Sequence, residues 1–313
     1  MNCCFAVLEK EALLSVEGPD ALQFLQGQLT CDTRKLDIHR ALPGLYCTPQ
    51  GRVICDVLLV QLATDRIGMR LRRDLRDASA ALLAKYIVFS RARLQAEADD
   101  WAVLGCWGTD AGAALGETFG TLPQGLYASA GNGASLLVQT DTGGEMFECL
   151  LPLADAETIL EKLARVAAPA AATGWEARQV VAGAARIEAA TSGEFIPQML
   201  NYDLSGHISF NKGCYTGQEV VARMHYRGKP KRRLHLATLP AAGERGEAPA
   251  PGARLVTVDG QNAGTVVNAV PDSAGPWQLL VTATHQGVEQ GLRLEDTSGP
   301  LLQIGELPYP VPQ

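Results

Sequence analysis

Hydrophobic positions recur at helical spacing in several segments of the first two thirds of the chain. In segment 18–29, Leu22, Leu25 and Leu29 follow each other at three- and four-residue steps, and Pro19 suits a first helical turn. The same criterion predicts helices at 73–85, 109–119, 155–166 and 175–189, while β-branched and leucine-rich runs predict strands at 53–62, 101–106, 135–139 and 145–151. Because strands and helices interleave without a strict βαβ repeat, we expect an α+β fold.

The pattern changes after Pro230. Helical periodicity ends there, and short strands are predicted at 233–239, 254–258, 264–270, 277–284 and 292–296. Asp259 and Gly260 indicate a hairpin between two of these strands. Short strands at this spacing are typical of a small antiparallel barrel. We therefore expect two domains, an α+β region at 1–230 and a C-terminal β-barrel at 231–313.

Composition narrows the class of protein. The chain has 313 residues, of which 47% are hydrophobic, and no apolar run approaches the roughly 20 residues that a membrane-spanning helix needs. Its eight cysteines are scattered without a Cys-x-x-Cys pair, so neither a zinc site nor a stable set of cluster ligands is expected. The simplest interpretation is that the thiols are reduced and the protein is cytoplasmic. We expect neither a permanently bound metal nor a membrane partner.

The densest chemistry lies in the segment 212–219, which reads Lys-Gly-Cys-Tyr-Thr-Gly-Gln-Glu. Gly213 and Gly217 allow a positive φ or a close backbone approach to a ligand. An apolar run follows, so a helix is expected to begin near Gly217 and to offer free N–H groups. Cys214 lies near that helix start and two residues from Lys212, surroundings that favour a reactive thiolate. The alternative is a buried cysteine in a tight turn.

From Phe195 to Arg233 the sequence resembles the signature of the YgfZ-type folate-binding proteins, relatives of the glycine-cleavage T-protein, an aminomethyltransferase. The segments 18–30, 47–52, 85–90 and 307–309 extend the resemblance nearly end to end. The resemblance implies a T-protein-like fold with two subdomains around a central cavity, followed by a C-terminal barrel. It also implies binding of tetrahydrofolate or a derivative, with or without a polyglutamate tail.

The resemblance also implies roles for single residues. The essential cysteine of the family corresponds to Cys214 and its neighbouring lysine to Lys212, which makes these two the candidate catalytic residues. A tryptophan associated with folate corresponds to Trp175, whereas the second such tryptophan falls at about Glu11 and is absent. Amide side chains suit the edges of a pterin. The remaining candidate cofactor-binding residues are Gln198, Asn201, Gly213, Tyr215, Gly217, Gln218, Glu219, Arg223 and Arg227.

A basic segment follows the cysteine motif, although the net charge of the chain is −7. No acidic residue occurs between Glu219 and Glu244, and six cations do: Arg223, Arg227, Lys229, Lys231, Arg232 and Arg233. Such a segment suits a polyglutamylated folate tail, a phosphate backbone or an acidic partner, and it also suits a solvated linker between domains. Because it directly follows the cysteine motif, the carboxylates of folate are the preferred ligand.

Three classes of function are compatible with these observations. The first, which we favour, is a folate-binding accessory protein that transiently meets iron–sulfur enzymes or their assembly factors, including enzymes that thiolate tRNA, and uses Cys214. The second is a folate-dependent one-carbon transferase. It needs an acid at the cavity, and where the T-protein carries adjacent acids this chain offers only Asp56, whose strand register could turn it away. The third, direct tRNA binding by the basic segment, is not favoured.

Overall fold

The computed structural model describes residues 2–96, 99–239, 247–271 and 277–312. The chain forms two compact units that interleave along the sequence. Unit 1 comprises Met1–Tyr46, Cys55–Trp175 and His207–Thr216, and unit 2 comprises Cys47–Ile54, Glu176–Gly206 and Gly217–Gln313. The division of the sequence at residue 230 stays a prediction.

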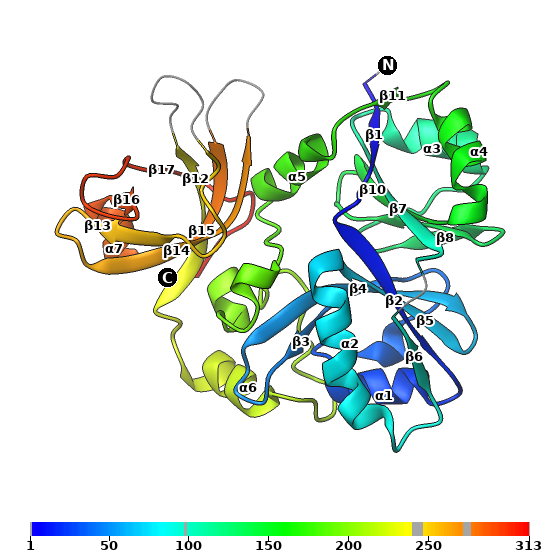
Figure 1. The fold of residues 1–313 in the computed structure, drawn as a ribbon, viewed down its shortest axis with the longest axis horizontal. Helices are drawn as coiled ribbons and strands as arrows, with labels where there is room; N and C mark the ends of the chain where they lie inside the picture. Colours follow the sequence, from blue (N-terminus) through cyan, green and yellow to red (C-terminus); the bar gives the residue numbers. More distant parts are fainter. Residues whose placement is uncertain (1, 97–98, 240–246, 272–276, 313) are drawn as a thin grey trace. The chain divides into compact units, whose positions relative to one another are not determined.

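Unit 1 contains two sheets. The five-stranded sheet has the order β3-β4-β5-β2-β6 and its strands are β2 (Glu11–Glu17), β3 (Leu42–Cys47), β4 (Val53–Ala63), β5 (Arg66–Arg72) and β6 (Arg93–Gln95). Helix α1 (Ala21–Gln28) follows β2, and α2 (Arg73–Ile87) follows β5 and packs against β2 and β5 (Figure 1). The sequence pattern therefore placed both helices correctly.

The second sheet of unit 1 has six strands in the order β11-β1-β7-β10-β9-β8. They are β1 (Cys4–Val7), β7 (Trp101–Trp107), β8 (Ser129–Asn132), β9 (Ser135–Gln139), β10 (Met146–Pro152) and β11 (Ala168–Pro169). Helices α3 (Ala111–Phe119) and α4 (Leu153–Leu163) pack on one face, where Phe147 and Cys149 of β10 join Leu115 and Leu163 in a buried core.

Every second side chain of these strands points into the space between the two sheets of unit 1. Leu13, Leu58 and Val60 of the five-stranded sheet share a core with Val138 and Leu150 of the six-stranded sheet. Glu148 lies between Phe147 and Cys149 in sequence and therefore points to the opposite face from them, toward the five-stranded sheet. This alternation brings charged side chains into the same buried layer.

Unit 2 is built on a six-stranded antiparallel sheet with the order β16-β13-β14-β15-β12-β17. Its strands are β12 (Arg232–Leu239), β13 (Arg254–Thr257), β14 (Asn262–Pro271), β15 (Trp277–Thr284), β16 (Leu292–Leu294) and β17 (Gln303–Gly305). The sheet curls into a half-barrel around a core that includes Leu255, Val266 and Val281. The short helix α7 (His285–Gln290) packs against β13, β14 and β15. The expected C-terminal β-structure is confirmed, with β16 and β17 as its edges.

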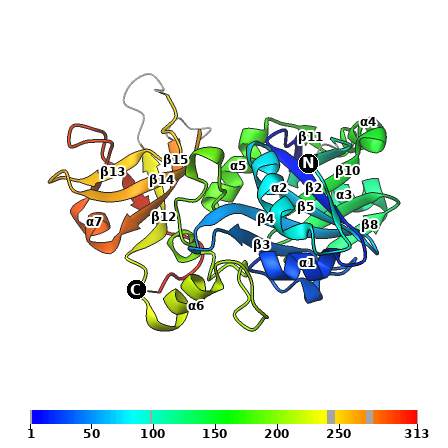
Figure 2. The ribbon, with the colours of Figure 1, turned by 60° about the horizontal axis from the view of Figure 1, so that its bottom comes forward.

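Two further helices bear on the site. Helix α5 (Ala172–Val181) is shorter than the predicted 175–189, because Gly183 has a left-handed φ of 68° just beyond its end. Helix α6 (Gln218–Arg227) begins where the cysteine motif ends and leads toward β12 (Figures 1 and 2). In the part of the chain that the structure describes, no helix combines the length and apolar character needed to cross a membrane.

Candidate functional site

The cysteine motif crosses from one unit to the other, with 212–216 in unit 1 and Gly217 onward in unit 2. Gly217 is the N-cap of α6 and has a φ of 84°. A Cβ added there would lie 2.5 Å from the carbonyl oxygen of Thr48, and one added at Gly51 would lie 2.9 Å from Cβ of Val220. The turn at 47–52 therefore fits against the start of α6 only because both positions are glycine.

Gly213 differs from Gly217. It is exposed, its φ does not lie in the left-handed region, and an added Cβ would meet no atom within 4 Å. The expected backbone requirement therefore holds at Gly217 and is not seen at Gly213.

Lys212 anchors the segment in unit 1. Its side chain is buried, and the ammonium Nζ donates hydrogen bonds to the carbonyl oxygens of Gln26 at 2.8 Å, Leu29 at 2.5 Å and Cys31 at 2.7 Å. Two of these carbonyls belong to the end of α1 and its C-cap, a position that favours a cation. Burial lowers the pKa of Lys212 to about 8. Since all three N–H groups donate to carbonyls, none is left for the Cys214 sulfur.

Cys214 is exposed, whereas Lys212 before it and Tyr215 after it are buried. Tyr215 is buried, its ring centroid lies 5.1 Å from Nζ of Lys212, and the backbone N–H of Thr216 donates to the carbonyl of Gly27 at 3.2 Å. All eight cysteines lie in the described residues, and Cys214 is the one classed as exposed; Cys4 is partly exposed and the other six are buried. The alternative of a buried cysteine in a tight turn is therefore wrong.

Trp175 occupies a packed position in unit 1. Its side chain is 2% exposed, and its ring lies 6.2 Å from that of Trp107 with the planes tilted by 57°. A Cβ added to Gly105 of β7 would lie 2.7 Å from the indole, so this strand has a glycine where the ring packs. A contact between Trp175 and folate stays a prediction.

The two predicted amides lie in unit 2 and differ in their contacts. Asn201 has a left-handed φ of 56°; its Nδ2 donates to the carbonyl of Leu234 at 3.2 Å, and its Oδ1 accepts from the N–H of the same residue at 3.4 Å. Gln198 is 1% exposed and donates from Nε2 to the carbonyl of Val221 at 2.9 Å. Its Oε1 is buried and has no hydrogen-bond partner among the described residues. Gln198 thus has an acceptor oxygen without a donor among the described residues, while Asn201 is hydrogen-bonded to β12.

The remaining predicted residues lie along α6. Gln218 is partly buried in its first turn, and Glu219, Arg223 and Arg227 are exposed. Of the predicted site residues, four lie together in unit 1: Lys212, Gly213, Cys214 and Tyr215. Trp175 lies elsewhere in the same unit. The structure brings Gln198 next to α6 in unit 2 through Val221.

A buried charged cluster in unit 1 was not expected from the sequence. Nε of Arg70 lies 2.8 Å from Glu148, and its Nη1 lies 3.4 Å from Glu11 and 3.9 Å from Asp56. Nη1 of Arg72 lies 3.8 Å from Glu11, and all five side chains are buried. Asp56 thus faces the layer between the two sheets. Four of the five residues come from three neighbouring strands, a placement that only the sheet order reveals.

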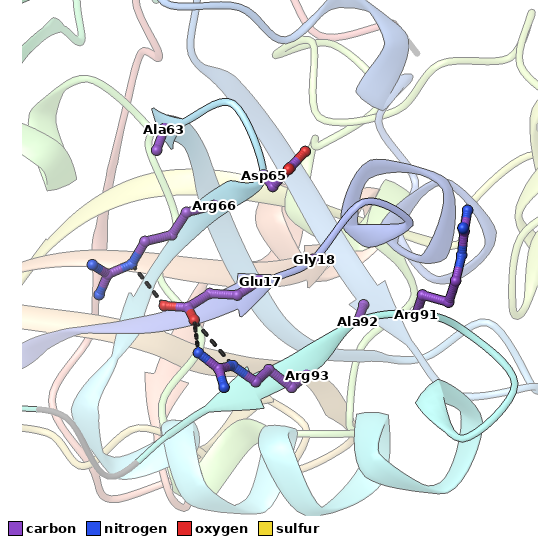
Figure 3. A pocket seen from close by; sticks show the side chains of 8 residues that line it. All are labelled: Glu17, Gly18, Ala63, Asp65, Arg66, Arg91, Ala92 and Arg93. Carbon is purple, nitrogen blue, oxygen red and sulfur yellow. Dashed lines mark hydrogen bonds and ion pairs between the residues drawn. The ribbon is translucent and has the colours of Figure 1, made fainter.

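A surface pocket of unit 1 is lined by residues that differ from every predicted site residue (Figure 3). Glu17 lies at its centre, 3.0 Å from Arg66 and 2.9 Å from Arg93, and Arg91 pairs with Asp20 outside the lining. The arginines are therefore balanced by carboxylates. Elsewhere, the described residues contain no group of three or more His, Cys, Asp or Glu side chains able to hold a metal ion.

Known proteins resemble the chain along nearly its whole length. Residues 8–130 match the family described as the GCVT N-terminal domain. The tRNA-modifying protein YgfZ of Sodalis glossinidius is 34% identical over 308 residues, which cover 97% of this chain and 92% of the relative. The protein of the same name from Cronobacter sakazakii is 35% identical over 308 residues, covering 96% and 92%.

The fold also matches a solved structure. The glycine cleavage system aminomethyltransferase T of Bartonella henselae aligns with 98% of this chain and 86% of its own, with a TM-score of 0.78 at 20% identity. This likeness shows a common fold. The sequence identities above, over nearly the full length of this chain and of its relatives, establish that the chain belongs to the YgfZ family of tRNA-modifying proteins.

Proposed function

We propose that this protein is a tetrahydrofolate-binding accessory factor of tRNA modification that acts in the cytoplasm and uses Cys214 as its reactive thiol. Its clients in this proposal are iron–sulfur enzymes, including those that thiolate tRNA, which it meets transiently. The observation that carries the proposal is the presentation of Cys214, the exposed cysteine of a chain whose other thiols are buried or partly buried. The names of the relatives, tRNA-modifying proteins, support the choice of process.

The geometry supports a division of labour within the motif. A thiolate is the nucleophilic and metal-binding form of cysteine, and it must be reachable by its partner. Lys212 and Tyr215 are both buried and fix the backbone on either side of Cys214. We assign Lys212 a positioning role, because its ammonium is fully used by three carbonyls of the 26–31 segment.

Gln198 provides the test of whether the residues present suit a folate. A buried acceptor without a donor costs about 1–3 kcal/mol, so the open Oε1 favours a ligand that brings an N–H group. The pterin ring of tetrahydrofolate carries such donors. Gln198 lies beside α6, whose first residues after the N-cap Gly217 are the predicted ligands Gln218 and Glu219. When bound, the cofactor would supply or accept a one-carbon unit.

The alternative of a one-carbon transferase has no comparable support. It requires a carboxylate that removes or holds a proton at the substrate. The candidate, Asp56, is buried 3.9 Å from Arg70 in a cluster that also contains Glu11 and Glu148. We therefore do not propose this activity.

Folate binding is tested by titrating the protein with tetrahydrofolate and following tryptophan fluorescence. Wild type should bind saturably. Gln198→Met keeps the volume of the side chain and removes the amide, and it should weaken binding by about 5- to 150-fold, the equivalent of about 1–3 kcal/mol. Gln286→Met, at an exposed position of α7, is the matched control and should bind like wild type. Absence of saturable binding to the wild type would overturn the folate part of the proposal.

A further inference from the structure

A strongly basic surface lies on unit 2, within a protein whose net charge is −7. We call it the α6 patch and define it as Arg223, Tyr226, Arg227, Lys229 and Lys231. All five side chains are exposed. They belong to the end of α6 and to the segment that leads to β12, whose backbone course Figure 2 shows. They lie within nine consecutive positions of the sequence, 223–231, all in unit 2.

The cations of the α6 patch are not neutralised by the protein. Within the described part of the chain, Arg223, Arg227, Lys229 and Lys231 have no carboxylate oxygen within 4.0 Å. Two neighbouring arginines behave differently: Arg233 lies 2.7 Å from Asp203, and Arg232 donates to Asn262. Arg232 and Arg233, at the start of β12, therefore interact within the protein, whereas the charges of the four cations of the α6 patch are available to a ligand.

An aromatic ring accompanies these charges. Tyr226 is 66% exposed, although a tyrosine of a packed helix usually buries its ring, and the ring of His225 meets it edge-on with centroids 4.8 Å apart. His235, the other histidine of this basic segment, is partly buried, and burial lowers its pKa. The exposed ring is therefore concentrated with the cations on α6.

We propose that the α6 patch binds single-stranded RNA, with the four cations on phosphates and Tyr226 stacked on an unpaired base. Arg223 and Arg227 are one helical turn apart, about 6 Å along the axis, so both can contact one strand. Cations that follow the backbone, interleaved with an aromatic that accepts any base, are the physical basis of single-strand binding. This assigns Arg223 and Arg227 to RNA rather than to the glutamyl tail expected from the sequence. The surface acts without folate, so the inference does not rest on folate binding.

The test is fluorescence anisotropy with a labelled single-stranded RNA of about 15 nucleotides, in the absence of folate, over a range of salt concentrations. For wild type, log Kd should rise with log salt with a slope of about 3, as expected for four phosphate contacts on a single strand. Arg227→Ala/Lys229→Ala/Lys231→Ala should lower the slope by about 2 and the affinity at least about tenfold at low salt. Tyr226→Leu should weaken binding about 5- to 150-fold with an unchanged slope.

The matched controls remove the same number of positive charges, or one exposed tyrosine ring, from unit 1. Lys85→Ala/Lys162→Ala/Arg165→Ala removes three exposed cations of unit 1, and Tyr86→Leu removes an exposed tyrosine of α2. Both controls should bind RNA like wild type. The proposal is overturned if wild type does not bind, if the unit 1 triple variant weakens binding as much as the α6 variant, or if pteroylpentaglutamate but not pteroylmonoglutamate displaces the RNA, which would identify a site for the folate tail.

Discussion

The ammonium of Lys212 donates a 2.8 Å hydrogen bond to the carbonyl of Gln26, 186 positions earlier in the sequence. With the bonds to Leu29 and Cys31, it closes the C-terminal end of α1. The loop that carries Cys214 is thereby tied to a helix of unit 1. In the sequence, the same lysine suggests a partner for the thiol; in the structure it is a clamp that sets where the thiol is presented.

Removing this clamp should destabilise the protein. Lys212→Met retains most of the side-chain volume but leaves three buried carbonyls without their charged donor, and it should lower the free energy of unfolding by about 2–3 kcal/mol. Lys35→Met, at an exposed lysine near the same segment, should change it by less than about 0.5 kcal/mol. Urea denaturation measures both. If Lys212→Met unfolds like wild type while Cys214 reacts more slowly with a thiol reagent, Lys212 acts on the sulfur instead.

The clamp should also depend on pH. The pKa of Lys212 is lowered by burial from 10.5 to about 8, so between these values the unfolded chain binds more protons than the folded one. Stability contributed by this residue therefore rises as pH increases from about 8 to 10.5. The difference in unfolding free energy between wild type and Lys212→Met, measured at pH 7 and pH 10, should widen at the higher pH. If this difference narrows at pH 10, the pKa of Lys212 in the folded protein is not lowered by burial.

The ion cluster between the sheets of unit 1 should be sensitive to loss of its central cation. Arg70→Met removes an arginine that lies within 3.9 Å of Glu11, Asp56 and Glu148, and should cost about 3–5 kcal/mol. Arg93→Met is the control, since Arg93 is 72% exposed and its pair with Glu17 should contribute less than about 1 kcal/mol. Equal effects of the two substitutions in thermal or urea unfolding would show that the buried cluster is not structural.

Gly105 should be required for the position of Trp175. Gly105→Ala would place a methyl group 2.7 Å from the indole, and the resulting shift should cost about 1–3 kcal/mol and change the tryptophan emission. Gly116→Ala, in α3 where an added Cβ meets nothing within 4 Å, should be neutral or stabilising by up to about 1 kcal/mol. If Gly105→Ala is as stable as Gly116→Ala, the packing described for Trp175 is incorrect.

Local patterns predicted the parts of the fold that have a period. The helices at α1, α2, α3 and α4 and most strands of unit 2 follow from the spacing of apolar residues and from turn residues such as Gly260, whose φ is 79°. Strands β2 and β3 were not predicted, because both are buried on both faces and lack a regular alternation of apolar and polar residues. Strand β5 has that alternation, but its Arg70 and Arg72 are buried, which the sequence pattern does not indicate. The predicted helix at 175–189 extends past the observed end of α5 at Val181, because Gly183 has a left-handed φ in the folded chain.

The site was predictable only as far as its chemistry is local. The motif itself located the thiol and the helix that begins after Gly217. It could not distinguish Gly217 from Gly213, since the atom that requires a glycine, the carbonyl oxygen of Thr48, lies about 170 residues away along the chain. The partners of Lys212 and the cluster around Arg70 are likewise set by tertiary packing, which no nearby residue signals.

The most direct test of the account is the content of thiolated nucleosides in tRNA from cells that lack a YgfZ-family protein and carry either wild type or Cys214→Ser. Purified Cys214→Ser should fold and bind tetrahydrofolate like wild type, because an exposed sulfur contributes little to packing. In cells it should fail to restore the modification, whereas Cys4→Ser, at the partly exposed cysteine, should restore it. Full restoration by Cys214→Ser would contradict the central claim that this thiol performs the chemistry.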